Sequence, residues 1–185
     1  MLRVKQHMSL RIIGCLKTCP PAQAKCLGDN LFRAAVDSCD EDAVMFILRA
    51  TNNSPNAIDP NKLVCQAMCE RRLFTLIELA AKSRHLGIVK ILLAAAADVN
   101  KTNVEESGRR YAECGALELA VRKWGDFEEA EIDMELVRTL LNAGAEIRTE
   151  LIASAVRWAQ GDLVEELLSR LPPTRHSELF FENII

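Results

Sequence analysis

The sequence predicts an all-α fold, a solenoid of stacked helix-turn-helix units with irregular insertions and with capping helices at its ends. Of the 185 residues, 49% are apolar but only 5% are aromatic, and alanine and leucine are abundant. This composition favours close packing of helices over a β-sandwich or barrel. A pattern of two short amphipathic stretches around a tight turn also recurs along the chain, as stacked repeats require.

The clearest unit runs from Thr75 to Asn100 and reads TLIELAAKSRHLGIVKILLAAAADVN. It resembles the ankyrin repeat, a helix pair that leaves through an extended loop. The residues that match the family pattern are Thr75, Ile77, Leu79, Ala80, Ala81, His85, Ile88, Val89, Leu92, Leu93, Ala97, Asp98, Val99 and Asn100. Arg84 and Ala96 stand where the family usually has glycine. The resemblance therefore implies a strained left-handed backbone, or an altered turn, at both positions.

The segments before this unit predict one more repeat and two less regular pieces. Residues 1–29 are basic and partly apolar, and we expect them to cap the first repeat or to form a basic docking arm. A degenerate repeat is expected at residues 30–50, with Asp40 as the cap of its second helix. After a turn-rich loop, Pro60 is expected to start an additional helix over about residues 60–72, or half of a further degenerate repeat.

Two further repeats are predicted after the central one, and a long loop over residues 101–114 precedes them. In the first, an acidic insertion after Trp124 separates the helices, and Asp126 or Asp133 can cap the second helix. In the last repeat, Thr149 is the expected cap. One ankyrin-repeat domain thus spans residues 30–171, with repeats at 30–50, 75–100, 115–147 and 149–171. Residues 172–185, which include Leu179, Phe180, Phe181, Ile184 and Ile185, are expected to cap its open end.

Composition and motifs exclude several classes of function. The formal net charge of −3 gives no general attraction to nucleic acid, and we expect no membrane span because no apolar stretch is long enough. Seven cysteines at irregular spacing argue against a secreted disulfide framework, so a cytoplasmic protein is expected. Phosphate-binding, zinc-protease and serine-hydrolase motifs are missing. We therefore expect no enzymatic activity, no cofactor and no metal.

Recognition of another protein is the function class that remains. The resemblance to ankyrin repeats implies which surface would contact that protein. In that family the partner usually lies across the concave face, against the loop tips and the exposed side of each first helix. Tryptophan and arginine are also frequent anchors of interfaces. Transferred by position, the expected partner-binding residues are Lys82, Arg84, Arg109, Arg110, Tyr111, Glu118, Arg122, Trp124, Arg157 and Trp158.

Three hypotheses of different classes follow. The first is a monomeric, non-enzymatic adaptor, inhibitor or pathogen effector that binds a partner protein, an effector acting in the host cytoplasm. The second is an enzyme with a Cys/His site on the insertions, for which Cys114 and His85 are the candidate pair. The third is a structural protein that self-associates through its end helices.

Overall fold

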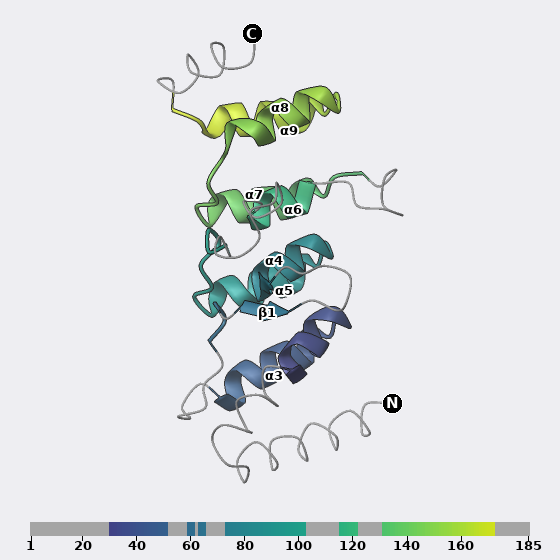
Figure 1. Cartoon of the computed structure of the whole chain (residues 1–185), viewed down its shortest axis with the longest axis vertical. Coiled ribbons are helices and arrows are strands. Elements are labelled where there is room, and N and C mark those ends of the chain that lie inside the picture. Colours follow the sequence, from purple (N-terminus) through teal and green to yellow (C-terminus); the bar gives the residue numbers. More distant parts are fainter. Residues whose placement is uncertain are drawn as a thin grey trace.

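Four helix pairs stack along one axis in the part of the chain that the structure describes, residues 30–51, 59–61, 63–65, 73–102, 115–121 and 131–172 (Figure 1). The structure is a computed structural model of the whole chain. It is mostly helical, which confirms the predicted all-α fold of stacked helix-turn-helix units. The predicted N-terminal cap (residues 1–29) and nearly all of the predicted C-terminal cap (172–185) lie outside the described residues.

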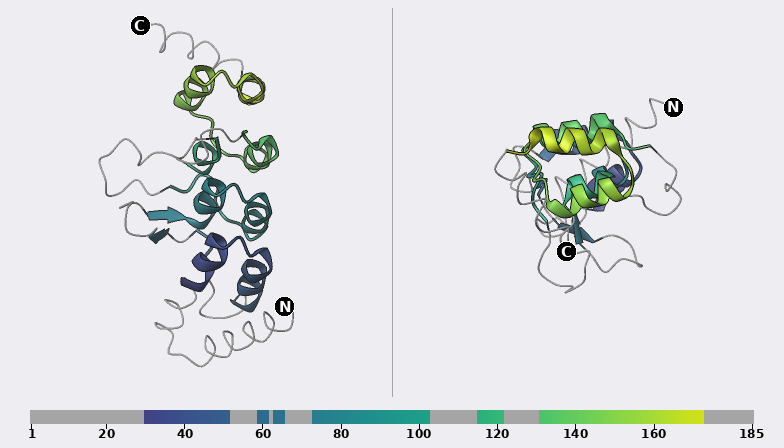
Figure 2. Two further views of the ribbon diagram at one scale, coloured as in Figure 1. Left: turned by 90° about the vertical axis from the view of Figure 1, so that its right-hand side faces the viewer. Right: turned by 90° about the horizontal axis from the view of Figure 1, so that it is seen from above.

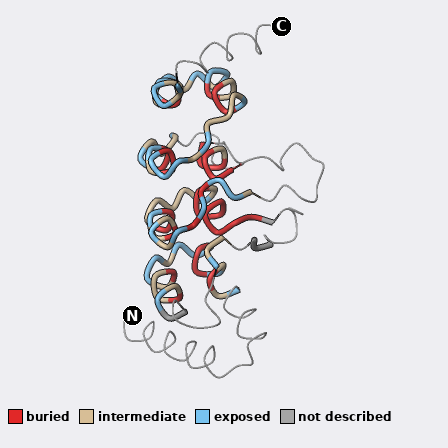
Figure 3. The backbone as a smooth tube through the Cα atoms, turned by 90° about the vertical axis from the view of Figure 1, so that its left-hand side faces the viewer, coloured by how far each residue is buried: buried red, intermediate tan, exposed pale blue. Residues whose placement is uncertain are grey.

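The helices form two layers, one made of the first helix of each pair and one made of the second (Figure 2). The first helices are residues 30–37, α4 (Leu76–Lys82), α6 (Ala116–Val121) and α8 (Thr149–Arg157). The second helices are α3 (Glu41–Thr51), α5 (Leu86–Ala94), α7 (Met134–Asn142) and α9 (Gly161–Arg170). Buried residues gather between the two layers, and exposed ones follow the outer side of the second layer (Figure 3).

Side-chain caps start three of the described helices, and one of them is Thr75, which accepts from the N–H of Glu78 (3.3 Å) before α4. Asp40 accepts a hydrogen bond from the backbone N–H of Ala43 (3.1 Å) before α3, as the sequence predicted. Asp133 accepts from the N–H groups of Glu135 and Leu136 before α7, which confirms one of its two predicted caps. Each such bond satisfies a donor that the helix itself leaves unpaired.

The predicted cap of the last repeat is wrong. Thr149 is the first residue of α8, and the N-cap position belongs to Arg148, which makes no side-chain cap bond. The Thr149 hydroxyl lies instead 3.4 Å from the Glu150 carboxylate. The loop before α8 is short, so the helix begins one residue earlier than the pattern of polar residues suggested.

The additional helix predicted over about residues 60–72 is wrong where the structure describes this segment. Pro60 lies in a turn, and Leu63–Cys65 form strand β1. It pairs antiparallel with β2 (Leu73–Thr75), with Val64 opposite Phe74. The hairpin lies beside the layer of first helices (Figure 2). A partner strand next to the start of α4 satisfies the backbone of both segments, and this outweighs the helix-starting preference of a proline.

Small side chains let the central repeats approach closely. Ala80 and Ala81 of α4 are fully buried, and Ala116 and Ala120 of α6 are 1% exposed. The contact between α4 and α6 is the most extensive between helices of neighbouring repeats. Larger residues fill the layer between first and second helices, among them Leu79, Ile88, Leu92, Leu119, Leu136 and Leu140.

The same backbone conformation recurs at the turn within three of the pairs. Cys39, Arg84 and Ala159 have φ values of 58°, 58° and 55°, each just after a first helix. Ala96 and Gly144 have φ values of 62° and 87°, each after a second helix. Of the two outcomes expected where Arg84 and Ala96 replace a glycine, a strained left-handed backbone or an altered turn, the structure has the left-handed backbone at both. A non-glycine residue in this region costs roughly 1 kcal/mol or more relative to glycine.

Candidate partner-binding surface

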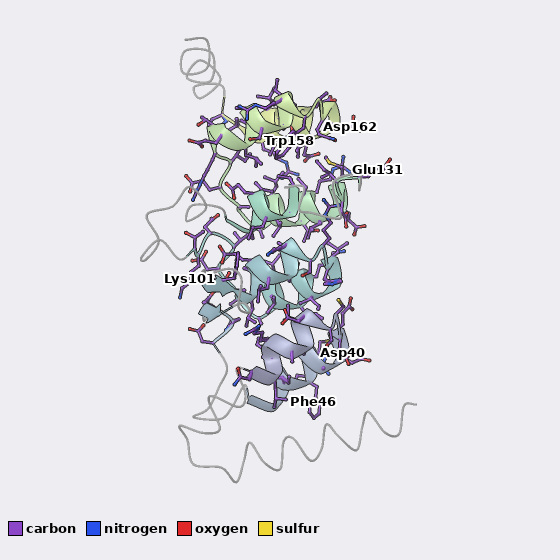
Figure 4. All side chains as sticks on the ribbon, turned by 45° about the vertical axis from the view of Figure 1, so that its right-hand side comes forward. Asp40, Phe46, Lys101, Glu131, Trp158 and Asp162 are labelled. Atoms are coloured by element: carbon purple, nitrogen blue, oxygen red, sulfur yellow. The ribbon has the colours of Figure 1, made fainter. Side chains whose placement is uncertain are left out.

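The turns inside the helix pairs lie along one edge of the stack. We call this surface the turn edge and define it as residues 37–40, 82–85 and 157–160, the ends of the first helices and the turns that follow them in the first, second and last pairs. Figure 4 places Asp40 and Asp162 toward this edge and Lys101, from a loop between repeats, on the opposite side. Four of the predicted partner-binding residues, Lys82, Arg84, Arg157 and Trp158, lie on the turn edge.

Two basic residues occupy the same position on this edge. Lys82 ends α4 and Arg157 ends α8. The ammonium of Lys82 lies 5.3 Å from the centroid of the Phe74 ring, a cation–π contact that holds the amine near the hairpin. Arg157 is exposed. A cation at the end of a helix is also favoured by the helix dipole, so this position has a structural as well as a recognition value.

Arg84 and Trp158 are both half-buried. The Arg84 guanidinium donates a hydrogen bond from Nη1 to the backbone carbonyl of Glu131 (3.0 Å), just before α7. Arg84 thus ties the second repeat to the third. Trp158 is the C-cap of α8, and its backbone N–H donates to Ser154. Its partial exposure leaves indole surface at the turn edge of the last repeat.

Glu118, another predicted partner-binding residue, has a structural role at the start of α6. Its side chain is only 15% exposed. The carboxylate accepts a hydrogen bond from the N–H of Gly115 (2.9 Å), as Glu78 does from Thr75 (2.7 Å) at the same position of α4. Burial raises the pKa of Glu118, although backbone hydrogen bonds and the charge of Arg148 oppose the rise. Glu118 therefore closes the start of α6.

The other predicted surface residues lie outside the described part of the chain. They are Arg109, Arg110 and Tyr111 in the long loop, and Arg122 and Trp124 at the acidic insertion. Cys114, one half of the alternative catalytic pair, lies outside it as well.

The structure brings a different cysteine to His85. The Sγ atom of Cys39, at the turn of the first repeat, contacts Nε2 of His85 at the turn of the second. The two residues are far apart in the sequence, and both belong to the turn edge. His85 is the N-cap residue of α5, but its side chain makes no cap bond to that helix. The side chain links neighbouring turns instead.

Two asparagines for which no contact was predicted connect successive repeats. Asn61 accepts from the N–H of Asp98 (2.6 Å), and Asn100 accepts from the N–H of Glu146 (2.8 Å). Asn100 also donates to the carbonyl of Gly144 (2.9 Å). The signal was present: Asp59-Pro60-Asn61 and Asp98-Val99-Asn100 share a D-x-N pattern, and in both the aspartate accepts from the N–H two residues on. Asn61 therefore ends the first repeat.

The described residues contain neither a cluster of metal-binding side chains nor a membrane-spanning helix. They contain no group of three or more His, Cys, Asp or Glu side chains placed to hold a metal ion. In the same residues, no helix is long and apolar enough to cross a membrane.

Comparison with known proteins supports the prediction that the central unit is an ankyrin repeat. The ankyrin-repeat family model matches residues 73–104, which span β2, α4, α5 and the loop that follows. No curated protein matches the chain. Repeats of this family generally act as protein–protein interaction modules and are typically non-enzymatic. The comparison thus shows an ankyrin repeat at residues 73–104, and the other described helix pairs stack on it as similar helix-turn-helix units.

Proposed function

We propose that this chain is a non-enzymatic protein-binding module and that it holds its partner on the turn edge. One observation carries the proposal. A basic residue recurs at equivalent sequence positions in three successive repeats: Lys82 and Arg157 are the last residues of α4 and α8, and Arg122 stands four residues after Glu118 as Lys82 does after Glu78. Lys82 and Arg157 both lie on the turn edge, and Arg122 is the residue directly after α6. The row fits a partner that presents carboxylates along its length.

The half-buried Trp158 adds the anchor that a row of charges lacks. Exposed ion pairs contribute little affinity by themselves, whereas aromatic and arginine side chains that a partner desolvates dominate many interfaces. Trp158 directly follows Arg157, so the last repeat offers both kinds of group side by side. Trp124 holds nearly the same position in the third repeat by sequence, and we include it with Arg109, Arg110 and Tyr111 as further partner-binding candidates.

The proposal also covers the oligomeric state, the cellular role and the compartment of the protein. We propose that the protein works as a monomeric adaptor, inhibitor or pathogen effector in the cytoplasm, which for an effector is the host's. The irregular cysteine spacing supports a reducing compartment.

Affinity capture with this chain as the bait tests the proposal. The bait is compared with Arg157→Ala/Trp158→Ala and with a control, Lys90→Ala, which removes a cation from the opposite layer. Lys90 pairs with Glu135 at 2.7 Å and is exposed, so its loss changes charge without reaching the turn edge. We expect the double variant to lose the captured protein and the control to keep it. Thermal unfolding of each bait shows whether the fold is retained.

Two results would contradict the proposal. One is unchanged capture by a folded double variant, because the turn edge would then not be the contact surface. The other is equal loss with Lys90→Ala, because general charge would then explain the capture. Raising the salt concentration adds a further check: a partner held by the basic row should be released in part as charges are screened.

A further inference from the structure

The last helix pair leaves an apolar surface open at its outer face. Val156 on α8 is 61% exposed, the highest value for a large apolar residue within the described part of the chain. It lines an open groove with Val164 and Leu168 of α9 and with Ala159 of the turn between them. The pair lies at one end of the stack, and Phe46 of the first repeat lies near the other (Figures 1 and 4).

The same positions are buried in every earlier pair. Counted from the left-handed turn residue, Val156 corresponds to Val36 and Ala81, and both are fully buried. Counted from the capping glutamates Glu78 and Glu118, the third repeat has Val121 there, also fully buried.

A second position behaves in the same way. Val164 lies five residues after the left-handed turn residue of its pair, and Val44 and Val89 hold the same position in the first two pairs. In the third pair the equivalent residue is Val137, which lies as far before Gly144 as Val89 lies before Ala96. These three valines are fully buried as well. The groove is therefore the surface that each earlier pair presents to the pair after it.

The sequence beyond Pro172 carries the pattern of a further first helix. Ser177 stands seven residues after Arg170, the end of α9, just as Thr149 stands seven residues after Asn142, the end of α7. From there SELF parallels TELI of α8. In α8 the last two residues of that pattern, Leu151 and Ile152, are 4% and 7% exposed. Leu179 and Phe180 therefore align in sequence with these two buried residues.

We propose that residues 177–185 dock on this groove as the first helix of a further half-repeat and cover Val156, Val164 and Leu168. The segment has the length of α8, which is 9 residues. Residues 171–176, including the proline pair at 172 and 173, end α9 and make the connection, as residues 143–148 do before α8. The chain thus caps its own stack, which otherwise ends in an apolar face.

The same register provides a matched control for the test. Phe180 aligns with the buried Ile152, whereas Ile185 aligns with the exposed Arg157. We therefore compare Phe180→Ser with Ile185→Ser in the full chain, together with Val156→Ser and the double variant Val156→Ser/Phe180→Ser. Serine has a helix propensity close to that of valine and adds no charge, so an uncovered Val156 would tolerate it.

We expect Phe180→Ser to lower Tm by about 5–10 °C and Val156→Ser by about 3–5 °C. Ile185→Ser should leave Tm within about 1–2 °C of the unsubstituted chain. The double variant should fall no further than Phe180→Ser alone, because undocking already exposes Val156. Hydrogen exchange should show α9 amides that lose protection in Phe180→Ser and keep it in Ile185→Ser.

Any of four results would overturn the proposal: an unchanged Tm in Val156→Ser, equal losses in Phe180→Ser and Ile185→Ser, additive losses in the double variant, or a Tm and a light-scattering mass that rise with protein concentration. The last result would assign the groove to a second copy of the chain. None of these measurements involves the proposed partner, so they stand apart from the test of the turn edge.

Discussion

At the scale of single residues, the turns hold their shape against local preference. Cys39, Arg84, Ala96 and Ala159 all take left-handed conformations, although each has a Cβ atom. The hydrogen bonds that close these turns run between backbone groups, such as the N–H of Ala97 with the carbonyl of Leu92 (3.0 Å). Packing of the helices on either side therefore imposes the conformation, and the side chain at the turn is free to serve another purpose.

Replacing one of these residues by glycine should stabilise the fold. For Ala96→Gly we expect the free energy of unfolding to rise by about 0.5–1 kcal/mol, because relief of the left-handed strain exceeds the added entropy of the unfolded chain. Ala143→Gly is the matched control: Ala143 is also exposed but has φ −79°, so the same change should lower stability by roughly 0.5 kcal/mol. Urea unfolding measures both. Equal effects of one sign would show that the strain is absent.

Two glutamates, one buried and one bound by arginines, should make the stability of the fold depend on pH in opposite directions. Burial raises the pKa of Glu118 above its ordinary value of 4.5. The folded state then binds this proton more tightly than the unfolded state, so the contribution of Glu118 to stability grows as pH falls through the raised pKa toward 4.5. A hydrogen bond from Arg138, with a further one from Arg170, lowers the pKa of Glu166. Its stabilisation is present above pH 4.5 and is lost as pH falls through the lowered pKa.

Substitution by glutamine separates these two cases. Relative to the unsubstituted chain, Glu118→Gln should be more favourable at pH 7 than at pH 4, because it removes a charge from a buried place and keeps an acceptor for Gly115. Glu166→Gln should be less favourable at pH 7 than at pH 4, because it removes the charge that binds two arginines. Unfolding in urea across this pH range gives both comparisons. The same direction of change in both variants would contradict the assignment.

At the scale of elements, asparagine side chains join one repeat to the next. Asn100 satisfies a carbonyl and an N–H of the loop after α7, with distances of 2.9 and 2.8 Å. Asn61 does the same for the central repeat, where it meets Ala96 and Asp98. Loops between helices have no ladder of their own, so such bonds set their course. Salt bridges in the second layer add a weaker connection, as between Arg138 and Glu166 (2.9 Å).

Loss of one asparagine should therefore loosen a loop in the neighbouring repeat. We expect Asn100→Ala to cost about 1–3 kcal/mol, since two backbone groups lose their partner. Asn142→Ala is the control: Asn142 is exposed and accepts only from the Arg170 side chain in the described contacts, so its loss should cost about 0.5 kcal/mol. Hydrogen exchange at Glu146 should rise in the first variant only. Unchanged protection there would mean that the bond is unimportant.

At the scale of the whole molecule, the stack is not equally tight along its length. Alanines bring α4 and α6 together over the centre, whereas polar pairs such as Arg170 with Asn142 (2.8 Å) join the last repeat to the third. Repeat proteins gain stability from such neighbour contacts, so a tight centre and looser ends are the expected consequence.

A larger residue in the central contact should weaken the entire stack. We expect Ala120→Leu to destabilise the fold by about 1–3 kcal/mol, because the fully packed space between α4 and α6 has no room for three more carbon atoms. Ala94→Leu, at an exposed position on α5, should change stability by less than about 0.5 kcal/mol. Thermal unfolding compares the two. A stable Ala120→Leu variant would mean that the helices can move apart at little cost.

The sequence by itself determined the repeat unit, the caps at Asp40 and Asp133, and the strained turns at Arg84 and Ala96. These features depend on interactions between residues within one or two helical turns of each other, so a local sequence pattern is enough to predict them. The tertiary structure alone decided the hairpin of β1 and β2, the inward side chain of Glu118, the contact of Cys39 with His85, and the open face at Val156. Each of these depends on which distant segment packs against it, and a side chain on a stacked helix is buried or exposed according to whether a neighbouring repeat covers it.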